Sequence, residues 1–182
     1  MARRHAESLS AGGARGPDGS GQWITIVVDR PARAASVLPC ARVKSPLDAS
    51  LDRLVAAARA VAENAYAPAS RFPVGAALLA DDGAIFVGCN VENASYGLTI
   101  CAERNAVFAA VAAGHRRFTA VVIHTECDPP GYPCGACLQV LAEFGPQMEV
   151  VLVNAAGKMV RTSLPSLMPR PFRFESLPEL SP

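Results

Sequence analysis

Two short stretches, Cys101-Ala102-Glu103 and Pro133-Cys134-Gly135-Ala136-Cys137, decide most of what this sequence indicates. A C-x-x-C pair with a third cysteine elsewhere in the chain is typical of a zinc site. Three protein ligands leave one coordination position for water, as in catalytic rather than structural zinc sites. Glu103 adds a carboxylate that can carry a proton beside the metal. We predict that Cys101, Cys134 and Cys137 hold one catalytic Zn²⁺ per chain, with Glu103 as the acid and base rather than a ligand.

Both motifs fall where a helix is expected to begin. One Ala-rich helical run extends from Cys101 to Ala113 and is closed by Gly114, and a second extends from Cys134 to Phe144 and is stopped by Gly145-Pro146. Free N–H groups and the helix dipole favour anions at such ends, and zinc binds cysteine as the thiolate. We expect Cys101 at the cap or in the first turn, so that Glu103 can approach the metal. Arg104 is expected to offset part of the charge of three thiolates.

Two plainer interpretations of the cysteines stay open. A structural zinc would need a fourth ligand, for which His124 at a strand end is the best candidate. The six cysteines could instead form three disulfides in a secreted protein, although the 51% apolar content and the lack of a secretory segment favour a reducing cytoplasm. Cys89 is expected in the core, and Cys127 in a loop near the site with no role.

The charge distribution divides the chain in two. Residues 1–45 carry seven Arg and Lys against three Asp and Glu, whereas residues 46–182 carry ten against thirteen. The first segment is rich in Ala, Arg, Gly, Ser and Pro, so we expect it to be poorly ordered, apart from an isolated strand over 23–28. The mildly acidic remainder argues against a nucleic-acid partner, and no apolar run is long enough to span a membrane.

The periodicity of apolar residues predicts an α/β fold with one sheet between helices. A helix is expected from about Ser45 to Ala65, followed by a hairpin with its turn at Asp81-Asp82-Gly83. The hairpin strands are expected over 74–79 and 84–89. The later expected elements are a polar loop over 90–98, a helix over 101–113, a strand over 118–124, a loop over 125–133, a helix over 134–144 and strands over 150–153 and 158–161.

The C-x-E and P-C-x-x-C motifs are those of zinc nucleobase deaminases, and about residues 50–175 resemble the small homotetrameric cytidine deaminases. The resemblance extends to Tyr66-Ala67-Pro68, Ser70 to Leu79, Gly88 to Tyr96 and Leu167 to Phe172. It implies a three-layer fold with a five-stranded mixed sheet between helices. It also implies a cytoplasmic homotetramer that converts free cytidine and 2′-deoxycytidine to the uridines in pyrimidine salvage. The deaminase domain would span 46–175, with an N-terminal extension over 1–45 and a tail over 176–182.

The resemblance also implies roles for individual residues. Phe72 would pack on the pyrimidine ring, and Asn90 with Glu92 would bind the ribose 3′-hydroxyl. Backbone at Ala102 and Cys134 would contact the base. Ala94, Tyr96 and Phe172 would be supplied to the site of a neighbouring subunit. Taken singly, Phe72 and Phe172 could be core residues, and Asn90 and Glu92 a solvated turn.

The sequence departs from the family pattern at two positions. Ala69 replaces an aromatic residue, and Leu138 replaces an arginine that usually follows the second cysteine of the pair. Three other functions stay open: deamination of another cytosine compound such as blasticidin S, a zinc-stabilised binding module, and polynucleotide editing. A binding module would not need Glu103, and an editor would need basic and aromatic residues interleaved on its surface.

Overall fold

The computed structural model describes residues 46–173. The predicted N-terminal extension over 1–45, with its expected strand over 23–28, lies outside the described residues, as does the tail over 176–182. Within the described range no helix has the length and apolar character that crossing a bilayer would demand.

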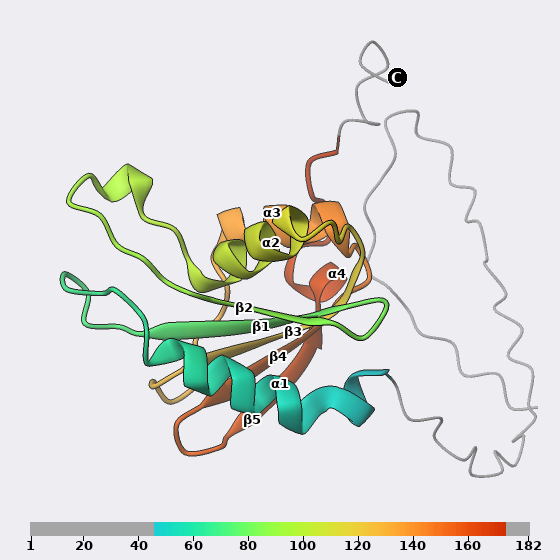
Figure 1. Cartoon of the computed structure of the whole chain (residues 1–182), viewed down its shortest axis with the longest axis horizontal. Coiled ribbons are helices and arrows are strands. Elements are labelled where there is room, and N and C mark those ends of the chain that lie inside the picture. The colour runs from blue at the N-terminus through green and yellow to red at the C-terminus, as the bar shows by residue number, and fades with distance from the viewer. Residues whose placement is uncertain (1–45, 174–182) are drawn as a thin grey trace, which may run out of the picture. The chain divides into compact units, whose positions relative to one another are not determined.

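The described residues form a five-stranded sheet between two layers of helices (Figure 1). The strands are β1 (Val74–Ala80), β2 (Ile85–Cys89), β3 (Phe118–Thr125), β4 (Glu149–Asn154) and β5 (Met159–Ser163). Their order is β2-β1-β3-β4-β5, and only β3 and β4 are parallel. The predicted mixed sheet is therefore confirmed.

Helix α1 (Pro46–Ala62) covers one face of the sheet, while α2 (Ala102–Ala112) and α3 (Gly135–Phe144) cover the other (Figure 1). Alternate residues of one strand pack against the two helix layers, because successive side chains of a strand point to opposite faces of the sheet. On β1, Ala76 and Leu78 pack toward α2 and α3, whereas Ala77 and Leu79 pack toward α1. The near-continuous apolar strands are thus explained by burial on both faces.

Two close contacts hold the helices against the sheet. A Cβ atom at Gly75 would overlap the carbonyl group of Ala58, so α1 lies directly on β1. A Cβ atom at Gly88 would overlap the backbone of Ala102 and Ala106, so the first turns of α2 lie directly on β2. The second contact fixes the end of α2 that carries Cys101 and Glu103.

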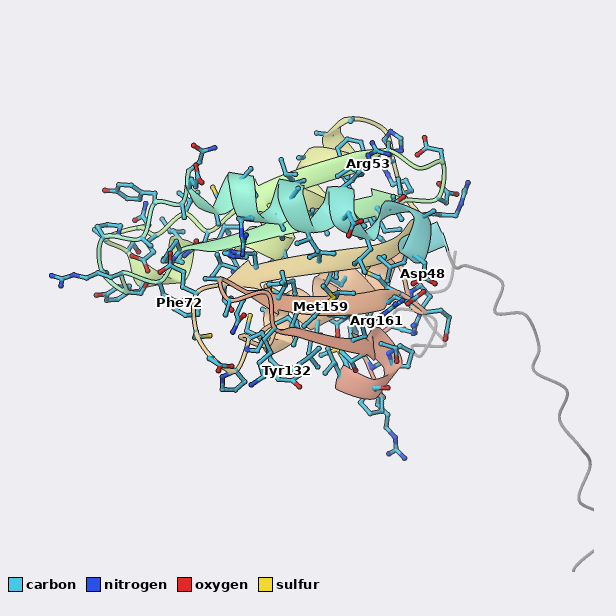
Figure 2. All side chains as sticks on the ribbon, turned by 90° about the horizontal axis from the view of Figure 1, so that it is seen from below. Asp48, Arg53, Phe72, Tyr132, Met159 and Arg161 are labelled. Atoms are coloured by element: carbon cyan, nitrogen blue, oxygen red, sulfur yellow. The ribbon has the colours of Figure 1, made fainter. Side chains whose placement is uncertain are left out.

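Arg161 on β5 links the sheet to α1 (Figure 2). Its guanidinium donates from Nη1 to Asp48 Oδ1 at 2.8 Å and from Nη2 to Glu149 Oε2 at 2.9 Å. The pKa of Arg161 is raised by these two hydrogen bonds, that to Asp48 having the larger effect. Because both ion pairs are exposed, we expect them to orient α1 on the sheet and to contribute little to the free energy of unfolding.

Several predicted boundaries need correction. Helix α1 ends at Ala62 rather than Ala65, because Asn64 and Ala65 donate to the carbonyl groups three residues back and tighten the last turn. The last strand is Met159–Ser163 rather than 158–161, and it runs into a short helix α4 (Leu164–Leu167) that the sequence did not predict. The Ser163 side chain caps α4 by accepting from Ser166 N.

Other corrections concern single residues. Cys89 is half-buried rather than a core residue, with its Sγ 3.5 Å from the Asn64 carbonyl oxygen. The loop over 90–98 holds one 3₁₀ turn, η1 (Tyr96–Leu98), and Val91 forms isolated bridges to Tyr66 and Ile100. Leu138, the departure beside the metal motif, is buried in the core between α3 and the sheet.

Candidate active site and metal centre

The three predicted ligands meet at the N-termini of α2 and α3. Cys101 and Cys134 are the N-cap residues of these helices, both with extended backbone, and Cys137 lies in the first turn of α3. The three sulfur atoms lie within 4.8 Å of one another, and Cys134 Sγ is 3.5 Å from Cys137 Sγ. Sulfur atoms in a tetrahedral zinc site stand about 3.8 Å apart. The predicted cap position of Cys101 is confirmed, and the donor set fits Zn²⁺.

The three sulfur atoms lie close enough to share a proton, and the same place suits a bound cation. The pKa of the Cys101 thiol is lowered to about 5, first by a hydrogen bond from Cys137 and then by Arg104. Arg104 Nη2 lies 3.5 Å from Cys101 Sγ and also donates to the carbonyl group of Thr99 at 3.2 Å. The pKa of Cys137 is raised because its proton is held between the sulfur atoms and the thiol is buried. A metal ion bound here would take the place of that proton.

Glu103 lies in the first turn of α2 and is only 4% exposed. Burial raises the pKa of its carboxyl group. A buried carboxyl group with a raised pKa holds a proton more readily than an exposed one, which suits a group that must act as both base and acid. Within the described range, the one group of side chains arranged to hold a metal ion consists of the three cysteines without Glu103.

A pocket of about 360 Å³ opens beside the cysteines, within the size range of small-molecule sites. Cys101, Ala102, Glu103 and Cys134 lie at its metal end. Its other lining residues come from the ends of β1 and β3 and from three loops: Ser70, Phe72, Val74, Asn90, Thr99, Ile123, Thr125, Gly131 and Tyr132. The structure therefore brings together the predicted metal ligands, Glu103, Phe72, Asn90 and Ala102.

Asn90 and Glu92 make hydrogen bonds to the segment that carries Phe72. Asn90 Oδ1 accepts from Val74 N at 2.8 Å, and its Nδ2 donates to Phe72 O at 2.9 Å. Glu92 accepts from Ala69 N at 2.8 Å, and the pKa of its carboxyl group is lowered by hydrogen bonds from Ser70 and Ala69. Both side chains thus fix the position of Phe72, and Glu92 does not line the pocket.

Besides Glu92, three residues predicted to bind substrate lie outside the lining of this pocket. Ala94, Tyr96 and Phe172 are all exposed, Tyr96 at 76% and Phe172 at 57%. The backbone of Phe172 pairs with the Gln139 side chain through bonds of 2.8 and 3.0 Å, which holds the C-terminal segment against α3. Aromatic side chains this exposed in one chain are common where another protein surface packs.

Sequence reasoning missed Thr125 and Tyr132. Thr125 Oγ1 accepts from Gly131 N at 2.9 Å, and so closes the loop that leads to Cys134. Tyr132 stands 60% exposed at the pocket, two residues before the first cysteine of the pair. Tyr132 could have been found from the sequence, because an aromatic residue beside a metal motif is a candidate pocket residue. The role of Thr125 could not, because its hydrogen bond to Gly131 exists only in the folded loop.

His124 is not a fourth ligand. Its neighbours Ile123 and Thr125 line the pocket of the cysteines, whereas His124 lines a different one on the opposite face of β3. The described cysteines Cys89, Cys101, Cys127, Cys134 and Cys137 are all free thiols, so the disulfide interpretation fails for that part of the chain.

Comparison with known proteins identifies this arrangement. Residues 49–154, more than half of the chain, match the model of the cytidine and deoxycytidylate deaminase zinc-binding region. The chain is 47% identical over 128 residues to the cytidine deaminase of Sporosarcina psychrophila, covering 70% of this chain and 94% of the relative. A weaker similarity, 31% over 104 residues, links it to a blasticidin-S deaminase of Bacillus cereus.

Solved structures agree with the sequence relatives. Cytidine deaminase from Burkholderia pseudomallei is 53% identical with a TM-score of 0.65, and the match covers 66% of this chain and 98% of that one. Cytidine deaminase from Mycobacterium tuberculosis is 40% identical with a TM-score of 0.59, covering 68% and 97%. The fold, the trio of cysteines and these matches lead to one conclusion: the chain belongs to the zinc-binding cytidine and deoxycytidylate deaminase family.

Proposed function

We propose that this protein is a zinc-dependent hydrolase that deaminates free cytidine and 2′-deoxycytidine to uridine and 2′-deoxyuridine. The observation that carries the proposal is Glu103, a buried carboxyl group placed beside three cysteine thiols at the end of a pocket. The relatives named as cytidine deaminases, at 44 to 47% identity, supply the reaction and the substrate.

The metal would be held by Cys101, Cys134 and Cys137. A zinc ion in such a site supplies Lewis acidity and makes a water molecule a nucleophile near neutral pH. Arg104, whose pKa is raised by its hydrogen bond to Cys101, neutralises part of the thiolate charge. The N-termini of α2 and α3 add partial positive charge at the same place.

Glu103 moves the protons of the reaction. Its carboxylate accepts one proton from the water as the water oxygen bonds to C4, and delivers that proton to N3 of the cytosine ring. It then takes the second proton from the new C4 hydroxyl and passes it to the amine. The C4–N4 bond breaks, the C4 oxygen becomes the carbonyl of the product, and the amine leaves as ammonia. Burial keeps the pKa of Glu103 raised, so that one group performs both the base and the acid step.

The remaining pocket residues orient the nucleoside. Phe72 packs on the pyrimidine ring, and backbone groups of Ala102 and Cys134 hold its polar edge. Asn90 and Glu92 bind the 3′-hydroxyl, and the lone pairs left over from their bonds to backbone N–H groups allow both tasks. These bonds also hold Phe72 in place, so sugar binding and ring packing are linked through the same two side chains.

The enzyme works as a homotetramer, and Ala94, Tyr96 and Phe172 complete the site of a neighbouring subunit. The exposure of both aromatic residues outside the pocket of their own chain supports this arrangement. A role in pyrimidine salvage in the cytoplasm follows from the substrates and from the need for reduced cysteine ligands.

The test is a spectroscopic assay that follows loss of the cytosine chromophore with purified, zinc-loaded protein. Cytidine, 2′-deoxycytidine, blasticidin S and a cytosine-containing oligonucleotide are compared at equal cytosine concentration. The proposal predicts turnover of the two nucleosides with kcat/KM far above that for blasticidin S and no turnover of the oligonucleotide. Turnover of blasticidin S alone would replace cytidine by that compound as the substrate.

A further inference from the structure

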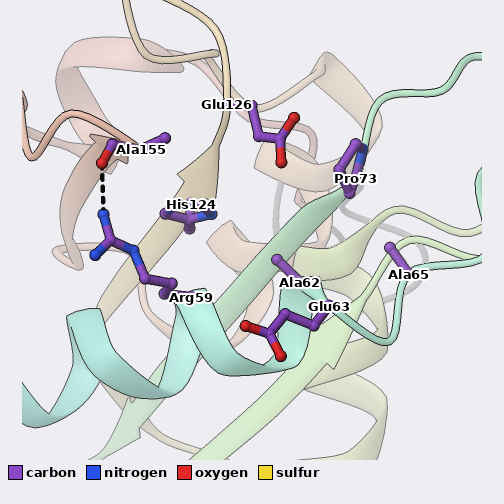
Figure 3. A pocket seen from close by; sticks show the side chains of 8 residues that line it. All are labelled: Arg59, Ala62, Glu63, Ala65, Pro73, His124, Glu126 and Ala155. Atoms are coloured by element: carbon purple, nitrogen blue, oxygen red, sulfur yellow. Dashed lines mark hydrogen bonds between the residues drawn. The ribbon is translucent and has the colours of Figure 1, made fainter.

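A second pocket, of about 370 Å³, lies on the α1 side of the sheet (Figure 3). It is lined by Arg59, Ala62, Glu63, Ala65, Pro73, His124, Glu126 and Ala155. None of these residues lines the pocket of the cysteines. Its volume is sufficient for a small organic molecule.

The two pockets lie back to back across the same strands. Along β3, Ile123 and Thr125 line the first pocket, and His124 between them lines the second. Just before β1, Phe72 lines the first pocket and Pro73 lines the second. This alternation is that of extended backbone, whose successive side chains point to opposite faces. The second pocket is therefore a separate site and not an extension of the first.

His124 is the anomaly in this pocket. It is only 5% exposed, and neither ring nitrogen has a hydrogen-bond partner in the protein. Buried polar groups in folded proteins nearly always have a partner. A neutral imidazole offers one N–H donor and one nitrogen acceptor. Burial, and then the charge of nearby Arg59, lowers the pKa of His124, which favours the neutral ring.

The charged groups around His124 are of opposite sign. Figure 3 shows Arg59 on one side of the His124 ring and Glu126 on the other, with Glu63 below the ring, directly after the end of α1. The Arg59 guanidinium donates from Nη2 to the carbonyl group of Ala155 at 2.7 Å, which fixes its position at the pocket. The pocket thus has a positive end at Arg59 and a carboxylate end at Glu126, with a second carboxylate, Glu63, on its α1 side.

This arrangement does not suit a metal ion. Among the described residues, the only three side chains of His, Cys, Asp or Glu arranged to hold one ion are the cysteines of the first site. Glu63, Glu126 and His124 are therefore not gathered for a single ion, and Arg59 would repel one. A molecule that matches both ends would carry a cationic and an anionic group separated by a short spacer.

We propose that this pocket binds a small zwitterionic amino compound, with its ammonium group at Glu126 and its carboxylate at Arg59. The ring of His124 lies between the two ends, where its unused donor and acceptor bond to the occupant. A compound with only one of the two charges leaves one end of the pocket without a partner.

The test is a titration of the full-length, zinc-loaded protein, followed by NMR of the histidine rings. The chain has three histidines, and His124→Gln assigns the signal of His124. The probes are glycine, β-alanine and 4-aminobutyrate, with methylammonium and acetate as one-charge controls at the same ionic strength. We expect a saturable shift of the His124 signal with one of the zwitterions, at lower concentration than with either control.

Substitutions decide whether the shift reports this pocket. Glu126→Gln and Arg59→Gln should each raise the Kd about tenfold or more, which corresponds to about 1.4 kcal/mol. Glu143→Gln, an exposed carboxylate on α3 outside the pocket, should leave the Kd unchanged. Absence of a saturable shift with all three zwitterions, or an equal response to acetate, would overturn the proposal. An unchanged Kd in Glu126→Gln would overturn it as well.

Discussion

The metal end and the loop rim of the active-site pocket differ in what holds them. Cys101, Glu103, Cys134 and Cys137 form the metal end and sit on the first turns of α2 and α3, with the core behind them. Phe72 and Tyr132 form the loop rim, where both are exposed, and side chains such as Asn90, Glu92 and Thr125 hold the loops. The metal end is thus complete within one chain, whereas the loop rim leaves aromatic surface uncovered.

This difference suggests that the metal end carries out bond breaking and that the loop rim recognises the substrate. Bond breaking requires groups held to within a fraction of an ångström, and helices packed on a sheet supply that precision. Recognition of a sugar tolerates loops, provided that hydrogen bonds or a neighbouring subunit order them. Changes at the metal end should therefore abolish turnover, and changes at the loop rim should alter substrate preference and KM.

Loss of a ligand should have the largest effect. Cys134→Ala should lose both zinc and activity, because two thiols do not complete the donor set. Metal analysis and the cytidine assay on the same sample measure this. Cys127→Ala is the matched control in the adjoining loop, and it should keep its zinc. Normal zinc content in Cys134→Ala would show that the ligand set is wrong.

Removal of the 3′-hydroxyl should have the next largest effect, at the loop rim. We expect kcat/KM for 3′-deoxycytidine to be about 10²-fold or more below that for 2′-deoxycytidine, because Asn90 and Glu92 would lose a partner. Glu92→Gln should narrow the difference between the two substrates. Comparable kcat/KM values for both in the wild-type enzyme would mean that these side chains only position Phe72.

Truncation of the exposed aromatic side chains should have a moderate effect. Tyr96→Ala and Phe172→Ala should raise KM several-fold and weaken the proposed tetramer, as measured in the nucleoside assay and by light scattering. Met159→Ala, which removes an exposed side chain on β5, is the control and should change neither quantity. If the wild-type enzyme is fully active as a monomer, Tyr96 and Phe172 do not complete a neighbouring site, and this prediction is wrong.

The smallest expected effect concerns stability. Burial raises the pKa of Glu103, so keeping this group ionised opposes folding once the pH exceeds its pKa in the unfolded chain. Metal-free Glu103→Gln should therefore melt a few degrees above the metal-free wild type at neutral pH. Below the pKa of an unfolded glutamate, the two Tm values should converge. A Tm difference that does not change with pH would exclude ionisation as its cause.

Sequence periodicity predicted the order of helices and strands, and the metal motifs predicted the metal end of the site. Cys101 and Cys134 could be placed at helix caps because capping is a local property of the chain. The loop rim was harder to predict, since the bonds from Ala69 N to Glu92 and from Gly131 N to Thr125 join residues brought together only by folding. The sequence also could not predict on which face of β3 His124 lies, because alternation of side chains does not by itself fix the strand register.

The central claim is that Glu103 carries protons and does not hold the metal. Glu103→Gln tests it directly through zinc content and kcat measured on one preparation. The account predicts about one zinc per chain with a loss of kcat of about 10³-fold or more, because the acid and base steps both depend on this carboxyl group. Loss of zinc in proportion to activity would contradict the account and make Glu103 a ligand.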